Sequence, residues 1–191
     1  MSTLHWDTLS SDTLLDCRVF TVKRITRSNH RREGEFFVLN GRDWCNIIPL
    51  TDDGQVVMVE QFRHGIGAVT LEIPGGIVDA DDATPLAAAR REMLEESGYD
   101  SEGIDAIGMV DPNPAIQGNV CHSFVARAVR RVADPRPDDL EELRVRLVPL
   151  VQIPALIQSG AISHSLVVAA FQFLFLRDGI PSAPVVEQSL S

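Results

Sequence analysis

Residues 90–99 read RREMLEESGY, which places three glutamates, Glu92, Glu95 and Glu96, in little more than one helical turn. Like charges three or four residues apart on a helix destabilise it by about 0.2–0.5 kcal/mol per pair. The whole chain is acidic, with 27 Asp and Glu against 17 Lys and Arg and a formal net charge of -10. The cluster therefore suggests that a positive charge sits between these carboxylates.

The sequence around the cluster predicts a helix with well-defined ends. Thr84 can cap its N-terminus, Pro85 suits the first helical position and Gly98 can end it. At about 100° per residue, Glu92 and Glu96 project in the same direction, beside an apolar side of the helix. That apolar side comprises Leu86, Ala89 and Met93.

Arg91 precedes Glu95 by four residues, so these two side chains can pair on the helix surface. The pairing leaves Glu92 and Glu96 with no basic residue nearby on the helix. A solvated helix face is the simplest interpretation of such a pair. The alternative is a bound cation, because the preceding turn, Pro74–Gly76, can bring a backbone carbonyl close to a ligand. Carboxylates, a carbonyl and waters form the all-oxygen shell that Mg²⁺ prefers.

The span from Gly76 to Tyr99 resembles the Nudix box, the signature of hydrolases that cleave a nucleoside diphosphate linked to another moiety. That box reads Gly, five residues, Glu, seven residues, Arg-Glu, an apolar residue, any residue, Glu-Glu, any residue, Gly and an apolar residue. Its second half is intact here as REMLEESGY, residues 91–99. In its first half Asp82 stands in place of Glu, and eight residues separate it from Arg91. One residue is thus inserted in a loop, where changes of length are tolerated best.

The resemblance implies a role for each acidic residue of the helix. Glu92 and Glu96 would be metal ligands, and Gly75, the residue before the box glycine, would contribute its carbonyl. Glu95 would be an additional ligand or an acid/base group, and Arg91 would orient these carboxylates. The implied cofactor is Mg²⁺, with Mn²⁺ as an alternative.

Residues 35–177 resemble one branch of that family, the pyrophosphatases of ADP-ribose and nucleotide sugars. The segments that carry this resemblance are IIPLTDDGQVVMVEQFRHG, LEIPGG, ELRVRLVPL and IQSGAISHSLVVAAFQFL. By the resemblance, Arg63 in EQFR approaches the diphosphate; otherwise it is a surface cation that pairs with a neighbour such as Glu60. Glu72 in LEIPGG is expected near the metal loop, either close to the ion or as a residue that only holds the loop.

Hydrolysis also requires a group that deprotonates or orients water. In the resembling branch this glutamate comes from an acidic loop before the strand that matches LRVRL. The corresponding segment here, DDLEEL, offers Glu141 and Glu142. We favour Glu141, because a residue next to a strand is harder to swing inward. Either residue could instead be a solvated loop acid.

Composition excludes several other classes of protein. The acidic balance is wrong for neutralising the phosphates of a nucleic-acid polymer. The three cysteines, Cys17, Cys45 and Cys121, form no CxxC pair, so we expect packed thiols and no zinc site or disulfide framework. The N-terminal residues do not resemble a secretory signal, and the most apolar stretch, 166–176, is too short to span a bilayer. We therefore expect a soluble, cytoplasmic protein with no membrane partner.

The pattern of strands and helices predicts an α+β protein, an α/β/α sandwich with a small antiparallel β appendage. We expect the appendage at residues 1–43, with strands at 16–27 and 35–39, the hydrolase domain at 44–178 and a loose tail at 179–191. A last apolar helix is expected from a cap at Ser163 to about Leu176. In the resembling branch the N-terminal strands pack across a two-fold axis, which implies a homodimer.

The sequence thus predicts a Mg²⁺-dependent hydrolase of nucleoside diphosphate sugars, with ADP-ribose split into AMP and ribose 5-phosphate as the leading reaction. One alternative is a Nudix-fold sensor that binds a nucleotide sugar without cleaving it. Another is a different Nudix pyrophosphohydrolase, acting on nucleoside triphosphates or dinucleoside polyphosphates.

Overall fold

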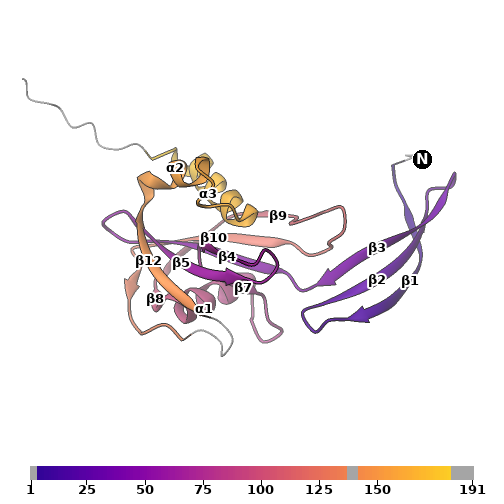
Figure 1. Ribbon diagram of the computed structural model, residues 1–191, viewed down its shortest axis with the longest axis horizontal. Coiled ribbons are helices and arrows are strands. Elements are labelled where there is room, and N and C mark those ends of the chain that lie inside the picture. Colours follow the sequence, from indigo (N-terminus) through magenta and orange to yellow (C-terminus); the bar gives the residue numbers. More distant parts are fainter. Residues whose placement is uncertain (1–3, 137–141, 182–191) are drawn as a thin grey trace, which may run out of the picture.

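The computed structural model describes residues 4–136 and 142–181, and Figure 1 traces them as a body from which an arm of three strands extends. The arm is an antiparallel sheet in the order β1-β2-β3. Its strands are β1 (Asp7–Asp16), β2 (Phe20–Ser28) and β3 (Glu33–Gly41).

A mixed sheet forms the centre of the body. Its strand order is β12-β5-β4-β10-β9, with β6 alongside β5 and β7 alongside β4. Strands β4 and β10 are parallel, and the other neighbouring pairs are antiparallel. The bounds are β4 (Trp44–Leu50), β5 (Gln55–Arg63), β6 (Ala68–Glu72), β7 (Gly75–Ile77), β9 (Gly103–Val110), β10 (Cys121–Arg127) and β12 (Leu143–Pro149), while β8 (Tyr99–Asp100) and β11 (Arg130–Arg131) form a separate two-stranded ladder.

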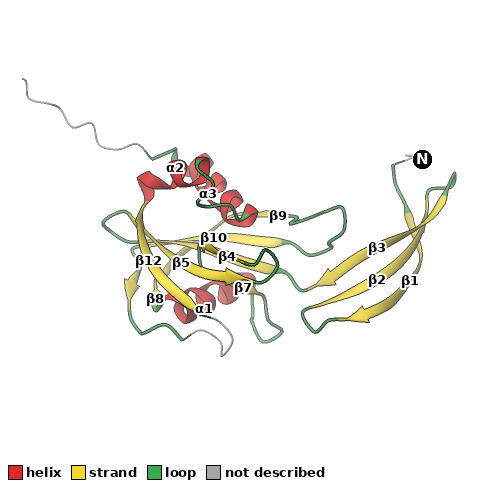
Figure 2. Cartoon of the chain, in the orientation of Figure 1, coloured by secondary structure: helices red, strands yellow, loops and turns green. Residues whose placement is uncertain are grey.

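Helices cover both faces of the central sheet, α1 on one side and α2 with α3 on the other (Figure 2). Alternate residues of β4 therefore enter two cores: Cys45 and Ile47 pack on the α1 side, Ile48 and Leu50 on the α3 side. This alternation follows from the period of two along a strand. The helical elements are α1 (Pro85–Ser97), the 3₁₀ turn η1 (Leu150–Gln152), α2 (Ile153–Gln158) and α3 (Ser165–Asp178). The predicted α/β/α sandwich is confirmed.

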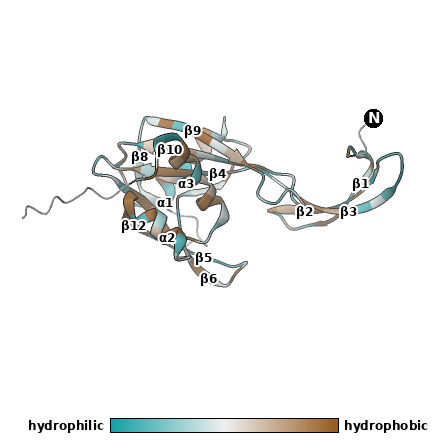
Figure 3. Ribbon diagram, turned by 90° about the horizontal axis from the view of Figure 1, so that it is seen from above, coloured by the Kyte–Doolittle hydropathy of each residue, from teal (hydrophilic) through white to brown (hydrophobic). Residues whose placement is uncertain are grey.

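The arm has one more strand than the sequence predicted. The expected strands at 16–27 and 35–39 correspond to β2 and β3, but the expectation missed β1, whose ten residues are all exposed. Apolar side chains on the arm lie open to solvent, among them Leu9, Leu15 and Phe37, which are 56%, 57% and 55% exposed. Figure 3 shows the arm reaching well away from the body.

Two contacts join the root of the arm to the body. The backbone N–H of Leu39 in β3 donates to the carbonyl of Ile116, at 2.7 Å. Arg42, between β3 and β4, forms an ion pair with Asp79 in the loop before α1. The loop that precedes α1 therefore touches the root of the arm.

The ends of α1 match the sequence prediction. The Thr84 hydroxyl accepts from the backbone N–H of Ala87 at 3.1 Å, and Gly98 ends the helix with a φ of 74°. A side chain at Gly98 would also collide, since its Cβ would lie 2.2 Å from the Ala133 carbonyl oxygen.

The predicted cap of the last helix was one residue early. His164 caps α3, not Ser163, because the His164 side chain accepts from the backbone N–H of Leu166. The helix runs to Asp178, two residues beyond the predicted end at Leu176. Within the described residues, no helix has the length and apolar character that crossing a membrane requires. Most of the expected tail, 179–191, lies outside the described residues.

Replacing Thr84 by Ala should destabilise the protein by about 0.5–2 kcal/mol, because α1 loses the acceptor for the Ala87 N–H. Thr84→Ser keeps a hydroxyl at this position and should stay close to wild type. Urea unfolding of the three proteins measures the difference. Equal stability of the Ala and Ser variants would contradict a capping role.

Candidate active site

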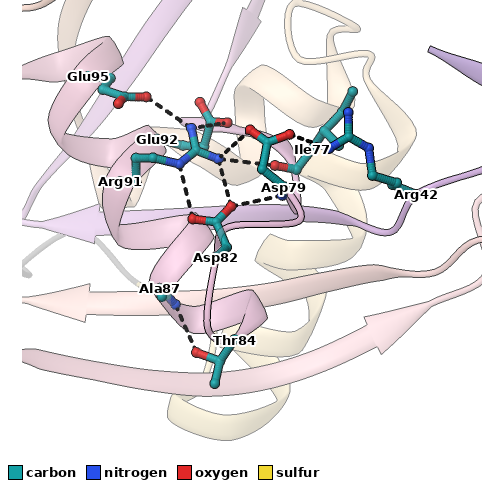
Figure 4. Close-up of polar contacts among 9 residues, drawn as sticks. All are labelled: Arg42, Ile77, Asp79, Asp82, Thr84, Ala87, Arg91, Glu92 and Glu95. Carbon is teal, nitrogen blue, oxygen red and sulfur yellow. Dashed lines mark hydrogen bonds and ion pairs between the residues drawn. The ribbon is translucent and has the colours of Figure 1, made fainter. Parts of the chain in front are cut away.

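Arg91 lies at the centre of the acidic cluster (Figure 4). Its Nη1 donates to Glu92 Oε1 at 2.9 Å and to Glu95 Oε2 at 3.0 Å. Its Nη2 also donates to the Ile77 carbonyl, at 3.2 Å. The predicted pairing of Arg91 with Glu95 is present. The expectation that Glu92 has no basic residue nearby was wrong, because the long arginine side chain reaches its sequence neighbour as well.

Asp82, the residue that departs from the box pattern, binds the other edge of the same guanidinium. Arg91 donates to its two carboxylate oxygens from Nε at 3.2 Å and from Nη2 at 3.0 Å. The loop around Asp82 is closed by the Asp79 N–H, which donates to Asp82 Oδ2 at 2.8 Å. The hydrogen bonds from Arg91 hold the pKa of Asp82 below its ordinary value. The inserted residue therefore leaves an acidic partner for Arg91 in place.

Glu92 and Glu96 both reach strand β7. A Cβ atom added to Gly76 would lie 2.3 Å from Glu92 Oε1, so the missing side chain at Gly76 makes room for that carboxylate. The N–H of Gly75 donates to Glu96 Oε2 at 3.0 Å, and Glu96 is 3% exposed. The predicted glycine turn is thus a short strand, and two carboxylates one helical turn apart converge on it.

These residues suit a hard divalent cation. Glu92, Glu96 and the Gly75 backbone offer only oxygen atoms as ligands, which matches the preference of Mg²⁺. The described residues contain no cluster of three or more His, Cys, Asp and Glu side chains arranged around a metal position. Any ion here would therefore be completed by backbone oxygen, water or substrate phosphate. Glu95, whose side chain is 43% exposed, lies at the edge of this arrangement.

A second charged pair lies on β5 and β6. Arg63 donates to both oxygens of Glu72, from Nε at 2.8 Å and from Nη2 at 2.7 Å, and Thr70 donates to Glu72 Oε1 at 2.5 Å. Glu60, the alternative partner considered for Arg63, binds Arg146 and Arg144 of β12. Burial alone would raise the pKa of Glu72, but the hydrogen bonds from Arg63 and Thr70 outweigh it and lower that pKa.

A cavity of about 300 Å³ is lined by the Arg63–Glu72 pair and by Gly75 and Gly76, the residues of β7 that Glu96 and Glu92 approach. It lies between β4, β6 and β7 and the first turn of α3. Side chains or backbone of Trp44, Asn46, Arg63, Glu72, Gly75, Gly76, Cys121 and His164 line it. Sequence reasoning missed Trp44, Asn46 and His164, because Trp44 and Asn46 look like ordinary residues of a buried strand. Burial raises the pKa of both Cys45 and Cys121 to about 12, as expected for packed thiols.

Of the two glutamates expected to position water, Glu141 lies outside the described residues. Glu142 is exposed and directly precedes β12. The first residue of β12, Leu143, pairs with Gln61, two residues before Arg63. Glu142 therefore lies at the same end of the sheet as Arg63.

A family model described as the NUDIX domain matches residues 42–171, which is most of the chain. The chain belongs to the NUDIX domain family. The matched segment contains β4 to β12, α1, α2 and the first half of α3, and so includes the carboxylates of α1 and the Arg63–Glu72 pair. The predicted membership in the Nudix hydrolases is confirmed.

Relatives of this NUDIX protein include pyrophosphatases of two nucleotide sugars. The ADP-ribose pyrophosphatase of Bacillus subtilis (strain 168) is 27% identical over 135 residues, covering 70% of this chain and 72% of the relative. The GDP-mannose pyrophosphatase of Citrobacter koseri is 26% identical over 182 residues, covering 87% and 94%. The crystal structure of an ADP compounds hydrolase matches with a TM-score of 0.82 over 93% of this chain and 96% of that chain, and at 18% identity it shows the shared fold.

Replacing Asp82 by Asn should destabilise the NUDIX domain at pH 7 by roughly 1–2 kcal/mol, because a charge-assisted pair with Arg91 is lost. Since the pKa of Asp82 is lowered by folding, its contribution is complete above the ordinary aspartate pKa of about 3.9 and disappears as the pH falls through the folded value. The difference from wild type should therefore vanish in acid.

Urea unfolding at pH 7 and at successively lower pH measures this difference. Asp81→Asn removes an exposed neighbouring charge and serves as the control. A stability gap for Asp82→Asn that is unchanged in acid would show that its carboxylate charge is not what holds Arg91.

Proposed function

We propose that this chain is a Mg²⁺-dependent hydrolase that cleaves the diphosphate of a nucleoside diphosphate sugar, with ADP-ribose split into AMP and ribose 5-phosphate. The observation that carries the proposal is the convergence of Glu92 and Glu96 on strand β7, beside the cavity that Arg63 lines. The strand that these carboxylates approach and the guanidinium of Arg63 line one cavity, so groups suited to a cation and to phosphate lie near each other.

The relatives support the substrate class. One is named for ADP-ribose and another for GDP-mannose, which share a diphosphate between a nucleoside and a sugar but differ in base and sugar. The relatives therefore support a nucleoside diphosphate sugar as the substrate more strongly than they support ADP-ribose or GDP-mannose in particular. We choose ADP-ribose as the first substrate to test.

Each residue of the site has a distinct task in the proposed reaction. Glu92 and Glu96, together with the Gly75 carbonyl, would hold the ion. When bound, Mg²⁺ (or Mn²⁺) neutralises phosphate charge and makes water a better nucleophile. Arg91 fixes the rotamers of Glu92 and Glu95, and a preset geometry avoids reorganisation during the reaction.

Arg63 and Glu72 act on the substrate side of the proposed site. The two hydrogen bonds to Glu72 fix the plane of the Arg63 guanidinium at the cavity wall. A guanidinium carries five N–H donors in a rigid arrangement that suits phosphate oxygens. Glu72 is buried and holds Arg63, so we assign it a positioning role. For the group that orients the attacking water we propose Glu141 or Glu142, with Glu95 as an additional acid/base candidate.

We also propose a homodimer formed through the N-terminal appendage, residues 1–43, next to a hydrolase domain at 44–178. The exposed apolar side chains of the arm support this proposal, because soluble monomers rarely leave such surface uncovered.

Purified protein with Mg²⁺ and ADP-ribose should give AMP and ribose 5-phosphate, and free phosphate only after alkaline phosphatase is added. Glu96→Gln should lower turnover about a hundredfold or more, since weaker metal binding forfeits several kcal/mol of charge stabilisation. Glutamine can still accept the Gly75 N–H, so the fold should persist.

Glu102→Gln, which removes an exposed carboxylate outside the site, is the matched control. Calorimetric binding of ADP-ribose with no product over hours would favour a sensor. Pyrophosphate released from nucleoside triphosphates would favour another pyrophosphohydrolase.

Sedimentation equilibrium should give twice the 21.0 kDa mass of one chain. Phe37→Asp should shift the equilibrium towards the monomer, because it places a charge on an apolar side chain of β3 that is 55% exposed. Asn40→Asp adds the same charge to the same strand without removing apolar surface and should remain dimeric. A monomeric wild-type protein, or a Phe37→Asp variant that dimerises normally, would rule out this interface.

A further inference from the structure

The cavity between β4 and the first turn of α3 is too small for a whole nucleoside diphosphate sugar. Its volume of about 300 Å³ lies at the lower limit of ligand pockets, which range over roughly 300–1,000 Å³. Arg63 and the Gly75–Gly76 segment line the same cavity. It can therefore take one end of a ligand whose phosphate lies near Arg63.

Asn46, which lines this cavity, carries a hydrogen-bond acceptor that has no partner in the described residues. The residue is 5% exposed, and its Nδ2 donates to the Leu166 carbonyl at 3.2 Å. Its Oδ1 is buried and has no hydrogen-bond partner in the described part of the chain. An acceptor that loses water on folding and gains nothing is costly, so such atoms in native proteins call for an explanation.

The neighbouring strand leaves the space beside Asn46 open. Gly75 of β7 pairs with Asn46 of β4, and a Cβ atom at Gly75 would lie 3.0 Å from the Asn46 Cβ. A side chain at position 75 would thus fill the volume beside the amide. The glycine thus leaves the space beside the amide open on the α3 side of the sheet, where Asn46 donates to Leu166.

His164 supplies a hydrogen-bond donor to the same cavity. Its Nδ1 accepts the Leu166 N–H at 3.2 Å, so this nitrogen carries no proton and the neutral ring has its proton on Nε2. Nε2 lies 3.9 Å from Glu72 Oε2, beyond hydrogen-bond distance. An N–H donor and a carboxylate therefore face each other across a gap that a hydroxyl group can bridge, since a hydroxyl both accepts and donates.

We propose that this cavity is the subsite for the sugar phosphate half of the substrate, and that Asn46 and His164 select its hydroxyl groups. An amide oxygen, an imidazole N–H and a carboxylate match a polyhydroxy compound, and Arg63 matches its phosphate. The inference rests on the proposed function. It goes further in assigning which half of the substrate enters the cavity and which residues determine the choice of sugar.

Calorimetry with ribose 5-phosphate and, separately, AMP tests the assignment, using the full chain in the presence of Mg²⁺. Asn46→Leu removes the amide at similar volume, and His164→Ser retains a cap for α3 while removing the imidazole. Each should weaken ribose 5-phosphate binding about tenfold, the loss expected for one hydrogen bond in a dry site, and change AMP binding less than twofold.

Ser123→Ala is the matched control. Ser123 pairs with Asn46 in the β4–β10 ladder and also has a buried atom, Oγ, without a partner in the described residues, but it does not line the cavity. Its removal should leave both affinities unchanged. Thermal melting establishes that each variant is folded.

Three results would overturn the assignment. The first is an unchanged affinity for ribose 5-phosphate in both cavity variants, which would leave Asn46 Oδ1 to a buried water. The second is a selective loss of AMP binding in these variants. The third is a wild-type protein that does not bind ribose 5-phosphate. Failure of the proposed function would give a different result. The wild-type protein would then bind ribose 5-phosphate through Asn46 but would not cleave ADP-ribose, so the subsite would stand and the proposed reaction would not.

Discussion

The approach of two carboxylates to strand β7 depends on the missing side chains at Gly75 and Gly76. A side chain at Gly75 would meet the Cys45 carbonyl oxygen at 2.4 Å, and one at Gly76 would meet Glu92 Oε1 at 2.3 Å. The two glycines thus let β7 pair with β4 on one side and receive α1 on the other. The position of Glu92 and Glu96 follows from this close contact between helix and strand.

Arg91 balances the charge that this contact brings together. Three carboxylates, from Asp82, Glu92 and Glu95, share its guanidinium, and Asp79 lies 3.5 Å from its Nη2. These interactions raise the pKa of Arg91, with the pair to Asp82 as the largest cause. Arg91 therefore offsets part of the negative charge of the acidic helix, and the buried Glu96 accepts the Gly75 N–H. A cation bound between Glu92 and Glu96 would neutralise the remaining negative charge.

Local signals made some of the structure predictable. Thr84, Pro85 and Gly98 define α1 through contacts within a few residues, and the sequence contains all of that information. Strand β1 was missed because its ten residues are all exposed, so no alternation of apolar and polar residues marks it. The cap of α3 was misplaced because Ser163 and His164 can both accept the N–H, and only the fold selects between them.

In the site, too, some features follow from local sequence and others only from the fold. Box residues such as Glu92 and Glu96 were identifiable from their spacing. The pairs Arg63–Glu72 and Arg91–Asp82 were not, because each joins residues nine positions apart and only the path of the loops brings them together. Asn46 carried no signal at all within the apolar strand WCNIIPL, since its lack of a partner is a property of packing.

The most direct test of the account is the position of the metal. Crystals grown with Mn²⁺ in place of Mg²⁺ and a non-hydrolysable ADP-ribose analogue would locate the ion by its anomalous scattering. The account predicts a peak bound by the carboxylates of Glu92 and Glu96, next to the Gly75 carbonyl. An ion held only by the analogue and water, with Glu96 still bonded to the Gly75 N–H and Glu92 to Arg91, would contradict it.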